Sequence, residues 1–189
     1  MRFLLCIALA ALVVSCRDGG TAVPRPVGYP RGPEHSAVYD TLPLPPFRPL
    51  AVSADAHVTV KKDLPGNKAV DITYPAFGAT VYVTLLQADG AAQLHQMWQN
   101  RLERIATNLG GASATRHVDG AGPVMTLTVT ATAATQTPVQ FLAADTVAMR
   151  LVTATAWLSA AATAANLDSL APTVAALRTD LSNLLILRP

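Results

Sequence analysis

Cysteine is scarce in this chain, and both cysteines lie at its start. Cys6 falls inside the first hydrophobic stretch and Cys16 follows its end. Residues 17–189 contain no thiol. This part of the chain can therefore form neither a disulfide framework nor a thiolate metal site, and it can supply no cysteine nucleophile.

Aromatic residues and an excess of charge are also lacking. Phe, Trp and Tyr together make up 5% of the sequence, so a core must be built mainly from Val, Leu, Ile and Ala. The 14 Lys and Arg residues nearly balance the 12 Asp and Glu residues. Proteins that bind nucleic acid need a basic stripe or patch. We therefore expect no nucleic-acid partner.

No hydrophobic run is long enough to span a bilayer as a helix, which takes about 20 residues. The longest run, residues 3–14, follows Arg2 and has the length of a signal-peptide core. It leads into the sequence VVSC, which resembles the lipobox of bacterial lipoproteins. The resemblance implies cleavage before Cys16 and acyl chains such as palmitate on Cys16. We therefore expect residues 1–15 to be a lipoprotein signal peptide, an ordinary secretion signal or an uncleaved anchor being the alternatives.

Proline concentrates in one part of the chain, between residues 16 and 55. Eight positions there carry it: Pro24, Pro26, Pro30, Pro33, Pro43, Pro45, Pro46 and Pro49. Proline disfavours helix interiors and central strands. We predict that residues 16–55 form a lipidated tether followed by an extended strap, and that residues 56–189 form a globular domain.

The strap carries side chains that are unusual for a linker, namely Arg25, Tyr29, Arg31, Glu34, His35 and Tyr39. Tyrosine and arginine are enriched in binding surfaces, where they bury area and form hydrogen bonds. We predict that these residues dock the strap on the domain or on a partner protein. A free, solvated linker is the plainer alternative, and metal binding or catalysis by Glu34 and His35 is a third.

Hydrophobic periodicity predicts the elements of the domain. We expect strands at residues 57–60, 70–74 and 80–85, a helix over 94–109 ended by Gly110-Gly111, strands at 114–118, 123–133, 139–143 and 147–158, and a last helix capped at 166–169. This order, βββαββββα, predicts an α+β fold. It would be a single antiparallel β-sheet with two α-helices packed on one face, preceded by the Pro-rich extended strap.

Two short motifs in the strap, Gly28-Tyr29-Pro30-Arg31 and Pro33-Glu34-His35, resemble the opening signature of the gliding motility-associated lipoprotein GldD family. In that family the signature also follows shortly after a lipidated cysteine. The resemblance continues at residues 72–77, 138–141 and 166–180. It implies a cell-envelope lipoprotein needed for gliding motility and linked to the type IX secretion machinery, with no catalytic activity attached.

Sequence motifs for catalysis are missing. The chain has no Gly-x-Ser-x-Gly motif and no phosphate-binding loop, and its four histidines fall on separate expected elements. We therefore expect no catalytic residue, no metal and no cofactor. The alternative is a periplasmic metal-dependent hydrolase or a small-ligand-binding lipoprotein that uses the region of Glu34 and His35.

The expected partners follow from the anchor and the resemblance. They are the membrane, reached through the lipid on Cys16, and other envelope proteins of the gliding and secretion machinery. No acidic run follows Cys16. We therefore expect a protein that faces the periplasm, with the inner leaflet of the outer membrane favoured and the cytoplasmic membrane as the other option.

Overall fold

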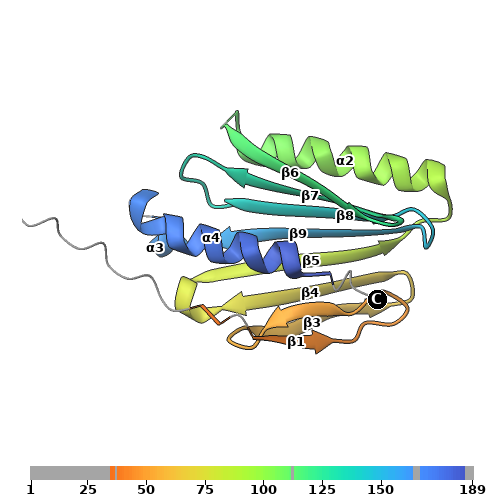
Figure 1. The fold of residues 1–189 in the computed structure, drawn as a ribbon, viewed down its shortest axis with the longest axis horizontal. Coiled ribbons are helices and arrows are strands. Elements are labelled where there is room, and N and C mark those ends of the chain that lie inside the picture. Colours follow the sequence, from red (N-terminus) through yellow and green to blue (C-terminus); the bar gives the residue numbers. More distant parts are fainter. Residues whose placement is uncertain (1–34, 37, 112, 164–166, 186–189) are drawn as a thin grey trace, which may run out of the picture. The chain divides into compact units, whose positions relative to one another are not determined.

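Seven antiparallel strands form the main sheet, in the spatial order β3-β4-β5-β9-β8-β7-β6 (Figure 1). The structure is a computed structural model that describes residues 35–36, 38–111, 113–163 and 167–185. The strands are β3 (His57–Leu64), β4 (Asn67–Tyr74), β5 (Ala79–Gln87), β6 (Ala114–Ala121), β7 (Val124–Ala131), β8 (Val139–Asp145) and β9 (Arg150–Leu158).

The helices lie where the hydrophobic spacing predicts them. The 19-residue α2 (Ala91–Leu109) follows β5, and the 17-residue α4 (Leu167–Asn183) follows β9. Two shorter elements, the 3-10 helix η1 (Pro75–Phe77) and α3 (Ala160–Thr163), lie in connections. Helix α2 ends at Gly110, whose φ of 57° places it in the left-handed region that favours glycine. The α+β class, the antiparallel sheet and the element order are thus confirmed.

The two long helices lie on opposite faces of the sheet, so the expectation that both pack on one face is wrong. Along β8, Phe141 and Ala143 pack in the same cluster as the α4 residues, while Leu142 and Ala144 pack with Leu94 of α2. Successive residues of a strand point to opposite faces. Figure 1 agrees, since α4 passes in front of the sheet while β6 passes in front of α2.

The burial of β8 explains this arrangement. All seven of its residues, VQFLAAD, are buried. A strand covered fully on one face only alternates between buried and less buried residues, as β4 does with its buried and half-buried positions. A strand that is buried throughout needs a layer on each side, and α2 and α4 supply these two layers.

Helix α2 covers only part of its face of the sheet. Its apolar residues pack in a cluster with side chains from β7, β8 and the start of β9. Further along the same face, Tyr82 on β5 is 47% exposed and Trp157 on β9 is 42% exposed. Register pairs Tyr82 with Thr155 and Thr80 with Trp157, so these aromatic residues lie close together on one open surface.

A second, two-stranded sheet forms within the Pro-rich segment. It consists of β1 (Tyr39–Leu42) and β2 (Leu50–Ser53), which pair antiparallel. The prolines at positions 43–49 lie between the two strands, where they interrupt no ladder. All four residues of β2 are buried, and the Ala51 amide donates to the carbonyl of Leu184 at 2.8 Å.

This small sheet adds to the core on the face that α4 covers. Leu44, Phe47, Leu50 and Val52 join the apolar cluster that also contains the leucines of α4. Residues 39–53 are therefore folded together with the domain, and the expectations of a single sheet and of an extended strap over these residues are wrong. Within the part of the chain that the structure describes, no helix combines the length and the apolar character that crossing a bilayer requires.

Candidate functional site

A buried carboxylate on α4 is the point where the strap meets the helix. Asp180 is 4% exposed, and its Oδ1 atom lies 2.7 Å from Nε2 of His35. The same oxygen accepts a hydrogen bond from the Tyr39 hydroxyl at 2.8 Å. Asn183, one turn further along α4, donates to the Tyr39 hydroxyl at 3.3 Å. Because a carboxylate only accepts, His35 is the donor in the first contact.

The helical repeat explains why an acidic residue is buried here. Asp180 lies three residues after Leu177 and directly before Leu181, and both leucines are essentially inaccessible to solvent. Residues three and four apart share one helix face, so Asp180 lies on the core-facing side of α4. A buried carboxylate requires hydrogen-bond partners, and the strap supplies two of them, both to Oδ1.

Aromatic rings lie beside the carboxylate. The His35 ring packs on Phe77, with ring centroids 5.8 Å apart, and Phe77 stacks on Tyr74 at 6.0 Å. Burial, followed by the negative charge of Asp180, raises the pKa of Tyr74 well above its ordinary value of 10.0. Burial likewise raises the pKa of Tyr39. Both phenols therefore resist ionisation at an alkaline pH at which an ordinary tyrosine ionises.

A second junction holds the far end of the folded strap. Arg48 lies 3.5 Å from Asp145 at the end of β8, measured from Nε to Oδ2. The other oxygen of Asp145 accepts hydrogen bonds from the amides of Val147 and Ala148. The guanidinium of Arg150 lies 5.5 Å from the ring centroid of Phe47. Contacts at both ends thus tie the segment to the domain.

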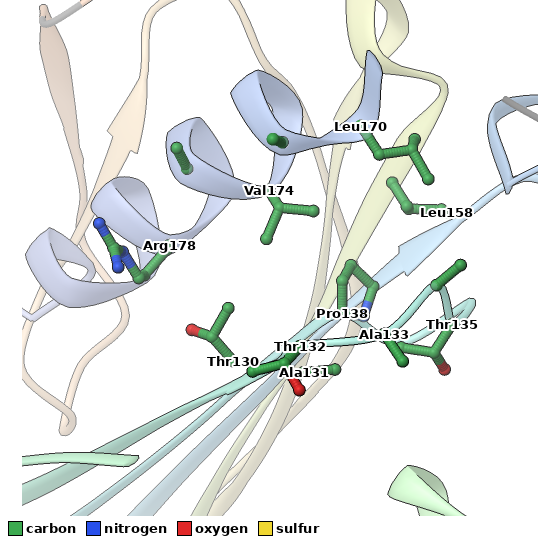
Figure 2. A pocket seen from close by; sticks show the side chains of 13 residues that line it. Thr130, Ala131, Thr132, Ala133, Thr135, Pro138, Leu158, Leu170, Val174 and Arg178 are labelled. Carbon is green, nitrogen blue, oxygen red and sulfur yellow. The ribbon is translucent and has the colours of Figure 1, made fainter. Parts of the chain in front are cut away.

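Several hollows lie near α4. A cleft of about 570 Å³ opens beside the carboxylate and is lined by His35, Ser36, Asp55, Tyr74, Ala76 and Phe77. A second cavity, of about 320 Å³, lies between α4 and the connection from β7 to β8. Figure 2 shows Leu158, Leu170 and Val174 facing this cavity, with Pro138 among the residues of the connection. Its lining suits a small apolar group.

The structure brings together only some of the residues that the sequence singled out. His35 and Tyr39 meet at Asp180. Cys16 and the remaining strap residues Arg25, Tyr29, Arg31 and Glu34 lie outside the described residues. The other three histidines lie exposed on β3, α2 and β6. Among the described side chains, no three His, Cys, Asp or Glu residues are grouped to hold a metal ion.

Sequence reasoning missed the carboxylate at the centre of this junction. Asp180 belongs to the stretch that carries the family resemblance, but nothing in the local sequence marks it as a partner of the strap. The signal that was present is its place between two core leucines on an amphipathic helix. Tyr74, which ends β4, and Asn183, which ends α4, were missed as well.

The raised pKa of Tyr74 predicts a loss of stability in alkaline solution. The unfolded chain ionises near pH 10.0 while the folded chain stays neutral, so the free energy of unfolding should fall as pH rises above 10.0. The loss should be about 1.4 kcal/mol per pH unit for this tyrosine. Urea unfolding of the Tyr74→Phe variant should show a shallower alkaline decline than the parent. An equal decline in both proteins would contradict this explanation.

A family model described as gliding motility lipoprotein GldD matches residues 19–186, a span that includes every strand and helix of the fold. No curated protein is significantly similar to the chain. The family places the protein among membrane-anchored lipoproteins of the cell envelope that are associated with gliding motility. The chain therefore belongs to the gliding motility lipoprotein GldD family.

Proposed function

We propose that the protein is a non-catalytic binding and assembly component of the gliding motility and type IX secretion apparatus. The acyl chains on Cys16 hold it on a membrane with its domain in the periplasm, the inner leaflet of the outer membrane being favoured. Family membership supports the link to gliding. The link to type IX secretion is carried over from the resemblance in the strap.

The contacts of His35 and Tyr39 with Asp180 are the observation that favours an assembly role over a catalytic one. Both side chains are engaged with Asp180, at 2.7 and 2.8 Å. These contacts join an N-terminal segment to the last helix across 145 and 141 residues of sequence. A junction of this kind fixes where the membrane tether leaves the domain. We propose that the docked strap sets the position of the domain relative to the membrane and to its partners.

Recovery of partners tests the assembly role. After cross-linking in intact cells, the full-length lipoprotein should be recovered with envelope proteins of the gliding and secretion apparatus, identified by mass spectrometry. The Tyr39→Phe variant, which loses only one hydroxyl of the junction, should recover the same set in smaller amounts. Recovery of none of these proteins, with the parent lipoprotein present at its normal level, would contradict an assembly role.

A periplasmic metal-dependent hydrolase, or a lipoprotein that binds a small ligand, is the second candidate. The observation that favours it is the cleft of about 570 Å³, which His35 and Asp55 both line. Metal analysis of the purified protein separates the two candidates. Stoichiometric zinc that disappears in a His35→Ala variant would favour the enzyme, whereas the assembly role predicts no stoichiometric metal in either protein.

A further inference from the structure

A third hollow, of about 280 Å³, lies on the sheet face opposite α4, between the last turns of α2 and strands β8 and β9. Its lining includes six polar or charged residues: Arg101, Arg104, Asn108, Gln140, Thr153 and Thr155. Arg101, Arg104 and Asn108 recur on one side of α2 at spacings of three and four. The two threonines alternate along β9 and so share this face.

Gln140 at the base of this hollow has a donor without an acceptor. Gln140 is 2% exposed. Its Oε1 accepts a hydrogen bond from Nδ2 of Asn108 at 3.1 Å. In this amide orientation, Nε2 is a buried donor with no partner among the described residues. Buried polar groups are normally paired. An acceptor bound in the hollow would complete the pairing.

Positive charge in the hollow is also uncompensated. Arg101 and Arg104 form no ion pair with any described residue, and the lining contains no Asp or Glu. Burial, and next the charge of Arg104, lowers the pKa of Arg101. Glu103 lies between them in sequence but is exposed and falls about 200° around the helix from Arg101. Arg101 is half-buried and Arg104 is exposed, and no acidic residue lines the hollow to offset the repulsion between their guanidinium groups.

We propose that this hollow, built by Arg101, Arg104, Gln140 and the two threonines, binds the phosphate group of a small water-soluble ligand. Two guanidinium charges match a phosphate dianion better than a single carboxylate. The donors also outnumber the two oxygens of a carboxylate, and the arginine fork suits phosphate oxygens. Trp157 and Tyr82 lie on the same face beside Thr155 and are 42% and 47% exposed, so their rings are placed to contact the organic part of the ligand.

Thermal unfolding of the full chain in detergent tests this site with inorganic phosphate as the probe. Because a ligand of the folded state stabilises it, phosphate should raise the melting temperature saturably above that in chloride of equal ionic strength. Arg101→Met should weaken the apparent affinity for phosphate at least about tenfold. Arg178→Met is the matched control, since Arg178 is exposed on α4 at the opposite face of the sheet and should leave the affinity unchanged.

A second variant keeps the test decisive if Arg101→Met is poorly folded. Arg101→Lys retains the charge but loses the fork, and broadening of the phosphate signal in phosphorus NMR should show weaker binding than in the parent. Three results would overturn the site: no saturable phosphate effect in the parent, equal phosphate affinity in Arg101→Met and the parent, or an equal effect of acetate and phosphate.

Discussion

Replacing Asp180 with alanine should lower the free energy of unfolding by about 2–4 kcal/mol. The change removes the acceptor of both His35 and Tyr39 and leaves two donors at a junction that is mostly closed to water. The His35 side chain is 18% exposed, so water recovers part of the loss. Urea unfolding at neutral pH measures the difference. Asp180→Asn keeps an acceptor oxygen and should lose less.

Asp89→Ala is the matched control for this prediction. Asp89 is exposed at the start of the connection to α2, and no hydrogen bond or ion pair of its side chain with a described residue is found. Its replacement should change the free energy of unfolding by less than about 0.5 kcal/mol. If Asp180→Ala were no less stable than Asp89→Ala, the strap would not be docked through this carboxylate.

Replacing Cys16 with alanine should release the protein from the membrane entirely. Each buried methylene of an acyl chain contributes about 0.8 kcal/mol to membrane binding, and two chains are enough for stable anchoring. Fractionation should therefore move the protein from the membrane to the soluble fraction, and mass spectrometry should find lipid on the parent protein only.

Cys6→Ala is the control for the anchor. Cys6 lies within the expected signal peptide, so its replacement removes the other thiol of the chain without touching the lipidation site. This variant should stay in the membrane fraction with the same lipid mass as the parent. Membrane retention of Cys16→Ala, or a parent protein without lipid, would contradict the lipoprotein assignment.

Local sequence signals predicted most of the secondary structure because they reflect local physics. The spacing of Leu94, Trp98 and Leu102 predicts α2, and Gly110 marks its end through a conformation that other residues adopt with strain. The turn-length gaps after residue 113 predict the antiparallel run from β6 to β9. The pairing of β9 with β5 joins segments that are far apart in the sequence, so no turn residues predict it.

The errors and omissions have physical causes as well. The helix periodicity shows that α2 and α4 each have an apolar face, but only the continuous burial of β8 shows that they cover opposite sides. Strands β1 and β2 were not predicted because the segment around them is rich in proline. The two strands flank the prolines at 43–49 and do not contain them. Burial of Asp180 depends on partners 141 and 145 residues away, so local spacing could not reveal it.

Deletion of the gene in the parent organism, with colony spreading and type IX-dependent secretion measured together, tests the central claim most directly. The claim is that this lipoprotein is an assembly component of the gliding and secretion apparatus. It predicts non-spreading colonies and a loss of secreted cargo, both restored by the parent gene and neither restored by the Cys16→Ala gene. A deletion strain that spreads and secretes like the parent would contradict it.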